Sequence, residues 1–91
     1  MNDDPAFKIL MANAEAMKRG ALPVWTIFDR PTDYPHGCIA RRSEGRKGEI
    51  VVADEVVVGS LEEIRALFER AGLYKLVRDA SDDPKIVETW I

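Results

Sequence analysis

A capping box at residues 60 to 63 constrains the fold of this chain more than any other feature. The hydroxyl of Ser60 can accept a hydrogen bond from the backbone N–H of Glu63, and the Glu63 carboxylate can accept one from the Ser60 N–H. Apolar residues then recur at helical spacing as far as the stop at Gly72; they are Leu61, Ile64, Leu67, Phe68 and Ala71. The pattern predicts one helix between two groups of strand-like segments.

Residues 5 to about 19 carry a second helical pattern. Asp3 or Asp4 is expected to cap it, with Pro5 in the first turn and Gly20 as the stop. An apolar stripe recurs at helical spacing, comprising Phe7, Leu10, Met11, Ala14 and Met17. A helix of about 14 residues is marginal alone. It is therefore expected to pack on its own sheet or on another chain, with Phe7, Leu10, Met11 and Met17 as a candidate interaction surface.

The remaining segments are β-branched and aromatic, which is typical of strands. Strands are predicted at 24–28, 38–42, 49–58, 73–78 and 85–91, with the third interrupted around 53–55. Short connections favour an antiparallel sheet. We therefore expect an α+β fold: an N-terminal helix followed by β-β-β-α-β-β, a mainly antiparallel sheet with a helix packed on one face. Residues 1–21 are interpreted as a helical extension and residues 22–91 as a small α+β domain.

Length and charge exclude several classes of protein. Ninety-one residues are expected to form one domain. A single cysteine rules out a disulfide framework and fits a reducing, cytoplasmic setting. Apolar runs fall short of the ~18–20 residues that cross a bilayer, so no membrane association is expected. The acidic start is unlike a signal peptide. A net charge of -3 disfavours a dedicated nucleic-acid-binding domain.

The loop from Asp29 to Cys38 holds the richest set of reactive groups. One hypothesis makes Cys38 a nucleophile and His36 its base, although such partners usually come from separated segments. A metal site would draw on His36, Cys38, Asp29 and Asp33, but a structural zinc site needs four Cys or His ligands. The alternative is that the carboxylates cap turns and that Cys38 is a small buried hydrophobe. We favour this alternative, and expect no catalytic residue, no metal and no cofactor.

A basic turn follows this loop. Arg41, Arg42, Arg46 and Lys47 are candidate anion or nucleic-acid contacts, with stacking from Tyr34 and His36. Residues 30–47 carry five cations against two acids, whereas residues 48–69 carry six acids against one arginine. We therefore favour the interpretation that these cations form local ion pairs over nucleic-acid contact.

Two tryptophans, Trp25 in the first predicted strand and Trp90 in the last, are expected in the core. Each buried indole N–H then needs a hydrogen-bond acceptor. An exposed tryptophan would instead be a candidate binding hot spot.

Several segments resemble short bacterial and phage-encoded open reading frames. The segments that carry the resemblance are Trp25-Thr26-Ile27-Phe28-Asp29-Arg30-Pro31, Asp33-Tyr34-Pro35, Ala40-Arg41-Arg42, Leu61-Glu62-Glu63-Ile64-Arg65, Arg78 and Asp83-Pro84-Lys85-Ile86-Val87-Glu88-Thr89-Trp90. The resemblance covers about three quarters of the chain, outside the N-terminal helix. It implies a compact small domain in a bacterial or phage setting and carries no assigned activity.

These patterns favour a non-enzymatic protein-interaction or regulatory module that binds a protein partner or self-associates as a homodimer. Two alternatives stay open. One is a nucleic-acid-binding regulator that uses the turn from Arg41 to Lys47. The other is a small enzyme that uses the His36 and Cys38 loop.

Overall fold

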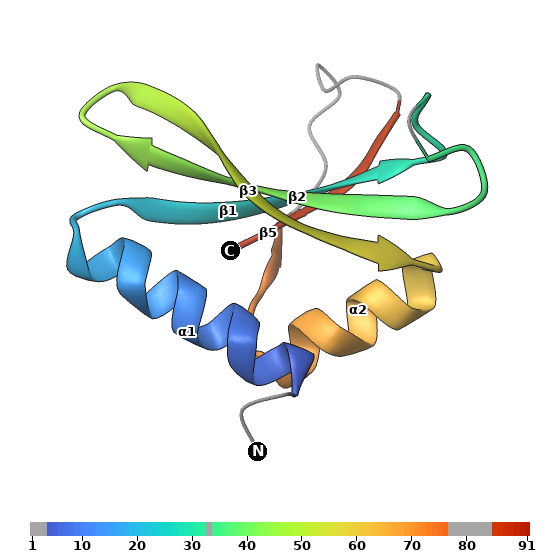
Figure 1. Cartoon of the computed structure of the whole chain (residues 1–91), viewed down its shortest axis with the longest axis horizontal. Helices are drawn as coiled ribbons and strands as arrows, with labels where there is room; N and C mark the ends of the chain where they lie inside the picture. Colours follow the sequence, from blue (N-terminus) through green and yellow to red (C-terminus); the bar gives the residue numbers. More distant parts are fainter. Residues whose placement is uncertain (1–3, 33, 77–84) are drawn as a thin grey trace.

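The computed structural model describes residues 4–32, 34–76 and 85–91 and has the predicted α+β architecture (Figure 1). Five strands form one sheet in the order β3-β2-β1-β5-β4, with every neighbouring pair antiparallel. Both helices lie on the same side of this sheet. The elements are α1 (Pro5–Lys18), β1 (Leu22–Asp29), β2 (Cys38–Arg46), β3 (Glu49–Gly59), α2 (Leu61–Arg70), β4 (Lys75–Leu76) and β5 (Ile86–Trp90).

The ends of α1 form as the sequence indicates. The Asp4 carboxylate accepts a hydrogen bond from the Ala6 N–H at 3.0 Å, and Pro5 opens the helix. Gly20 adopts a φ of 80°, which lets the Ala21 N–H reach the Ala16 carbonyl at 2.9 Å and close the last turn.

The face by which α1 packs on the sheet differs from the expected apolar stripe. The buried residues of α1 are Ala6, Ile9, Asn13 and Ala16, whereas Phe7, Leu10, Met11 and Met17 are exposed. Ala6 and Ile9 belong to the same buried cluster as Trp25, and Asn13 accepts a hydrogen bond from its indole, so this face of α1 packs against β1. The apolar stripe is therefore not the face by which α1 packs on its own sheet, and it stays a candidate interaction surface.

The helix α2 has the predicted capping box. The Ser60 Oγ accepts from the Glu63 N–H at 3.1 Å, and the Glu63 carboxylate accepts from the Ser60 N–H at 2.9 Å. Ile64 and Phe68 are buried against the sheet. This confirms both the helix and its apolar face.

Three aromatic rings form the centre of the core. Trp25 and Trp90 are opposite each other on β1 and β5, and both are buried as predicted. The Phe68 ring lies between them, with centroids 5.3 Å from Trp25 and 5.6 Å from Trp90. The indole N–H of Trp25 donates to Asn13 Oδ1 at 3.1 Å, and that of Trp90 donates to Glu88 Oε1 at 3.0 Å.

The β2–β3 hairpin is longer than expected. The two-residue turn uses Lys47 and Gly48 at φ values of 50° and 82°, so most of the segment between the predicted strands 38–42 and 49–58 is also strand. β3 runs without a break from Glu49 to Gly59, although its register against β2 shifts where an interruption was predicted. Pairing on either side of the shift, of Val52 with Ser43 and of Val56 with Arg41, keeps the strand continuous. Of the predicted strand at 73–78, residues 77 and 78 lie outside the described residues, as does the segment 79–84 that follows it.

Candidate functional site

The cysteine of the 29–38 loop lies in a setting that keeps its thiol protonated. Cys38 is buried at the start of β2, and its Sγ lies 3.8 Å from Asp29 Oδ1. Burial, and then the negative charge of Asp29, raise the pKa of the Cys38 thiol. An activated nucleophile needs the opposite shift. His36 is exposed, so the thiol has the Asp29 carboxylate as its partner rather than the imidazole.

The proposed metal ligands do not form a cluster in the described part of the chain. Across residues 4–32, 34–76 and 85–91, no three His, Cys, Asp or Glu side chains lie close enough to hold a metal ion. Asp33 is outside these residues.

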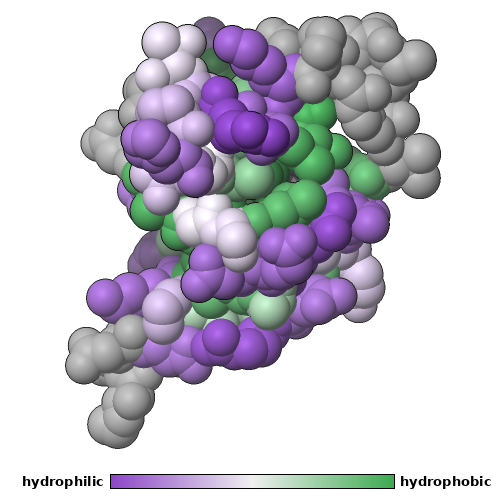
Figure 2. Space-filling model, turned by 90° about the vertical axis from the view of Figure 1, so that its right-hand side faces the viewer, coloured by the Kyte–Doolittle hydropathy of each residue, from purple (hydrophilic) through white to green (hydrophobic). Residues whose placement is uncertain are grey.

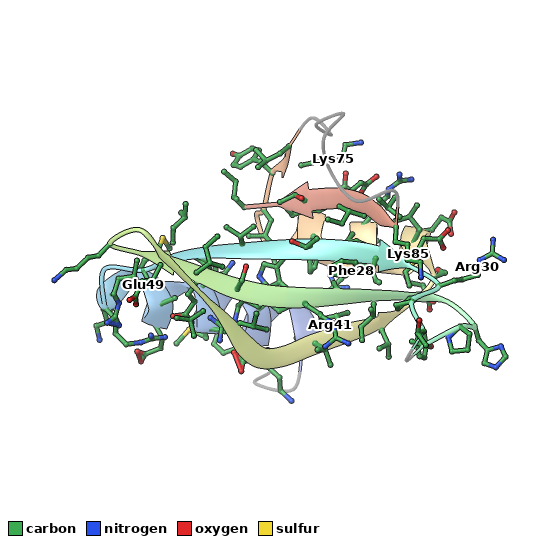
Figure 3. The ribbon with its side chains drawn as sticks, turned by 90° about the horizontal axis from the view of Figure 1, so that it is seen from above. Phe28, Arg30, Arg41, Glu49, Lys75 and Lys85 are labelled. Atoms are coloured by element: carbon green, nitrogen blue, oxygen red, sulfur yellow. The ribbon has the colours of Figure 1, made fainter. Side chains whose placement is uncertain are left out.

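The four candidate cations do not share one surface. Arg41 and Arg42 point to opposite faces of β2, because side chains alternate along a strand. Arg41 and Phe28 of β1 line one pocket on the face of the sheet away from the helices, the face that Figure 3 shows from above. Arg42 points toward the helices and is only 5% exposed. Arg46 and Lys47 lie at the exposed end of the hairpin.

Arg42 belongs to a chain of ion pairs that joins three elements. Its guanidinium contacts Glu44 on its own strand and Glu55 on β3. Glu44 also accepts from Arg19, which follows α1, at 2.9 Å and 3.2 Å. The hydrogen bond from Arg19 holds the pKa of Glu44 below its ordinary value, with a further contribution from Arg42. Arg42 is therefore engaged internally and is not placed to contact phosphate.

The four residues of the candidate interaction surface on α1 are all exposed. Their exposed fractions run from 41% to 59%. We call this set, Phe7, Leu10, Met11 and Met17, the α1 outer stripe. Its apolar side chains face away from the sheet because the opposite side of the helix carries the buried residues.

A second apolar surface follows β3, which is an edge strand. Within the described residues no strand pairs with the side of β3 remote from β2. Ile50, Val51 and Val52 are 78%, 56% and 67% exposed, and Val56 and Val58 are also exposed. Successive side chains point to opposite faces, so the hairpin presents apolar surface on both faces. We call these five residues, with the free backbone beside them, the β3 edge surface.

Edge strands usually carry charges, prolines or bulges that prevent pairing with another chain. In β3 the charges of Glu49, Asp54 and Glu55 and a register shift lie on either side of Ile50-Val51-Val52, but the three residues themselves have none of these features. Its apolar run was visible in the sequence, but its place at the edge is set by the strand order, which the sequence did not indicate.

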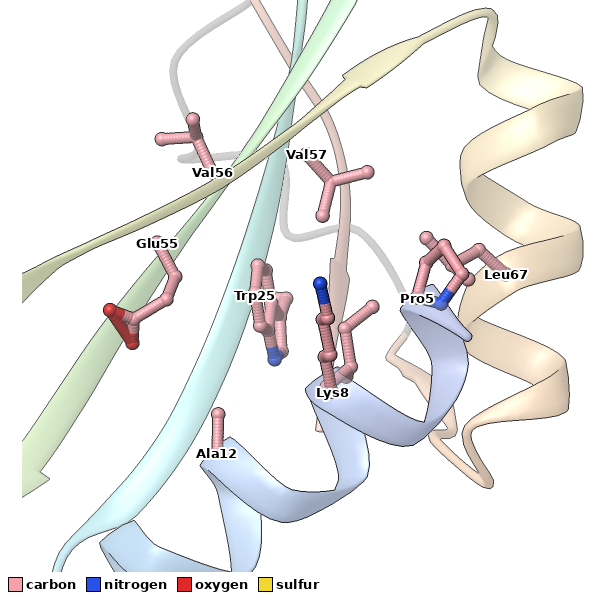
Figure 4. Close-up of a pocket in the computed structure, with 9 residues that line it drawn as sticks. Pro5, Lys8, Ala12, Trp25, Glu55, Val56, Val57 and Leu67 are labelled. Carbon is pink, nitrogen blue, oxygen red and sulfur yellow. The ribbon is translucent and has the colours of Figure 1, made fainter. Parts of the chain in front are cut away.

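A groove lies between α1 and the middle of β3, next to this edge (Figure 4). It encloses a cavity of about 350 Å³ lined mainly by apolar side chains. Trp25 lies between the two walls, Leu67 of α2 contributes at one end, and Val57 lines the β3 side. Lys8 of α1 and Glu55 of β3 add one charge of each sign. We call this the α1–β3 groove.

Apolar side chains also reach the surface elsewhere. On the face shown in Figure 2, hydrophobic atoms gather in a central band between hydrophilic regions.

In the part of the chain that the structure describes, neither helix is long and apolar enough to span a membrane.

Comparison with protein-family models, curated proteins and solved structures finds no match to this chain. The candidate surfaces therefore rest on their own geometry and chemistry.

Proposed function

We propose that this chain is a non-enzymatic protein-interaction module that binds an extended polypeptide segment along the free edge of β3. The observation that carries the proposal is the free edge of β3, whose apolar side chains are exposed on both faces along Ile50-Val51-Val52. Unpaired N–H and C=O groups of such an edge can pair with the backbone of an added strand.

The α1–β3 groove supplies the second element that strand addition requires. In an added strand every other side chain would point toward the helix side of the sheet. Beside Glu55 and Val57 that side opens into the groove between α1 and β3. Backbone pairing then provides affinity, and the apolar groove selects the side chain that enters it.

The charges of the groove restrict the segment further. Lys8 and Glu55 carry opposite charges on the α1 and β3 sides. A segment with an apolar residue between an acidic and a basic residue would complement both. We therefore propose that the ligand is an extended segment with alternating apolar residues, in which the residue that enters the groove lies between an acidic and a basic residue.

Selection from a displayed library of random ten-residue peptides tests this proposal. Immobilised protein should enrich peptides with alternating β-branched or aromatic residues. Val52→Lys places a charge on the edge and should abolish their binding, whereas Leu10→Lys on the α1 outer stripe should not. Both positions are exposed apolar residues, so the variants are matched in their effect on folding.

Amide hydrogen exchange locates the bound peptide. Binding at the edge should slow exchange along β3 and leave α1 unchanged. The proposal fails if no peptide is enriched, or if enriched peptides bind the Val52→Lys variant as well as the unmodified chain.

The α1 outer stripe remains a second candidate docking surface for the same kind of function. Its four exposed apolar residues favour it. It lacks the adjoining groove and the free backbone groups that β3 has, because a helix satisfies its own hydrogen bonds. Peptide binding that is lost in Leu10→Lys and kept in Val52→Lys would place the ligand on the stripe instead.

A further inference from the structure

We propose that the α1–β3 groove also binds a small molecule, an aliphatic carboxylate with a chain of about eight to ten carbons. The proposal goes beyond the proposed function, because such a ligand has no backbone that could pair with β3. It would bind through the size, the lining and the charge of the groove alone.

The volume of the groove sets the size of the ligand. The cavity of about 350 Å³ has room for about twelve non-hydrogen atoms, if each takes roughly the 30 Å³ that a water molecule occupies in the liquid. Small-molecule sites in proteins have volumes of roughly 300–1,000 Å³, so this cavity is large enough to be one. A carboxylate with about eight to ten carbons fills it without excess.

The lining of the groove favours an alkyl chain over a ring system. The α1 wall consists of residues from successive turns, roughly 10 Å of helix, so the groove is elongated. Val57 of β3 and Leu67 of α2 add aliphatic side chains to it. Among the described residues only Trp25 gives the groove an aromatic ring, and Trp25 is 1% exposed, which leaves little of its face for stacking.

The charge that the groove leaves uncompensated is positive. Glu55 is bound to the guanidinium of Arg42, and Asp4 at the start of α1 is bound to Arg70. Lys8 is exposed and has no ion pair in the described part of the chain. Its ammonium group reaches from α1 into the groove (Figure 4). A carboxylate is the complement of this group, and an alkyl chain attached to it is the complement of the apolar lining.

A bound carboxylate would also control the proposed peptide binding. Its alkyl chain would occupy the space beside Val57 that a peptide side chain needs. The two ligands should therefore exclude each other, and each should weaken the binding of the other by the same factor.

Three probes of equal chain length test the proposal: octanoate, 1-octanol and octylammonium. Their binding to the full chain is measured from the chemical shifts of the backbone amides at neutral pH. Octanoate should bind about threefold more tightly than 1-octanol, which is the scale of an ion pair that stays partly in water. Octylammonium should bind least. The shifts should change at residues 8–12 of α1 and 55–57 of β3.

Charge variants test the role of Lys8. Lys8→Gln should make octanoate bind no better than 1-octanol, because it removes the positive charge from the groove. Lys18→Gln is the matched control, since Lys18 is an exposed lysine on the same helix outside the groove. This variant should keep the preference for octanoate.

Variants that fill the cavity test its location. Ala12 lines the groove, so Ala12→Leu should weaken octanoate and 1-octanol alike. Ala14→Leu makes the same change at an exposed position of the same helix outside the groove, and it should weaken neither probe.

Four results would overturn the proposal. Octanoate that does not bind saturably, or that binds no better than the other two probes, would show that the groove does not select an anion. An equal effect of Lys8→Gln and Lys18→Gln would show only a general influence of net charge. Shift changes confined to the α1 outer stripe would place the probe elsewhere.

Peptide binding is measured separately, so the two proposals can fail independently. Val52 is outside the groove lining, and Val52→Lys should bind octanoate as the unmodified chain does although it loses the peptide. A chain that binds the peptide but not octanoate would overturn this inference and leave the proposed function standing.

Discussion

The indole N–H of Trp25 donates a hydrogen bond to the side-chain oxygen of Asn13 at 3.1 Å, in an interior where both residues are buried. This contact joins α1 to the central strand β1. It gives a polar residue a structural role on the packing face of a helix whose other buried residues are Ala6, Ile9 and Ala16.

Asn13→Ala should destabilise the protein by about 2 kcal/mol, because it leaves a buried N–H donor without its acceptor. The change is measured as the free energy of unfolding in urea. Glu15→Ala, at an exposed position two residues further along the same helix, is the control and should change stability little. A cost for Asn13→Ala no larger than that of the control would show that the contact contributes little.

Removing residues 1–21 should prevent cooperative folding. Trp25 is 1% exposed in the full chain and packs against α1, so the shortened chain would expose apolar core surface. Circular dichroism and thermal unfolding of a chain beginning at Leu22 check this. A cooperative transition in that chain would show instead that residues 22–91 fold alone and that α1 is an extension.

Stability should fall in acid because of Glu88. Burial raises the pKa of this carboxyl, but hydrogen bonds from Arg65 and Trp90 lower it by more, so that it lies below the ordinary value of 4.5. A group with a lowered folded-state pKa contributes stability that is complete above its unfolded pKa and is lost as the pH falls through the folded value.

Unfolding free energies measured from pH 7 down to pH 3 should therefore decline below about pH 4.5. Glu88→Gln should cost about 2 kcal/mol at pH 7, since it removes the charge from a buried pair. The variant should also show a weaker decline in acid. An identical pH profile in both proteins would mean that other carboxyls cause the decline.

The Cys38 thiol should react slowly in the folded protein. Burial and the Asp29 carboxylate raise its pKa above the ordinary 9.0, so the reactive thiolate is scarce near neutral pH. A chromogenic disulfide reagent at pH 7.5 should label it much faster in denaturant than in buffer. The raised folded pKa also means that this thiol's contribution to stability is complete below pH 9 and is lost at higher pH. Fast labelling in buffer would revive the nucleophile hypothesis.

Lys47→Asn should stabilise the hairpin by about 0.5 kcal/mol. Lys47 adopts a φ of 50° at the first position of the two-residue turn, a conformation that asparagine adopts more readily. Thermal unfolding measures the gain. Arg46→Asn, at the end of β2 before the turn, is the control and should bring no gain.

Local signals in the sequence determined the helices, their caps and most of the strands. The capping box at Ser60 and the stop at Gly20 act within one helical turn, so neighbouring residues were enough to locate them. The burial of Trp25 and Trp90 followed from their size and apolar character.

Tertiary structure decided which faces and edges are exposed. The α1 outer stripe carries the larger apolar side chains, yet the face that packs is the one with Ala6, Ile9, Ala16 and Asn13, the hydrogen-bond partner of the Trp25 indole. Arg41 and Arg42 are adjacent in sequence but lie on opposite faces of β2, since side chains alternate along a strand. Above all, the exposure of Ile50-Val51-Val52 depends on the strand order that places β3 at the edge. Such long-range pairing is set by the packing of the whole chain, and no local pattern encodes it.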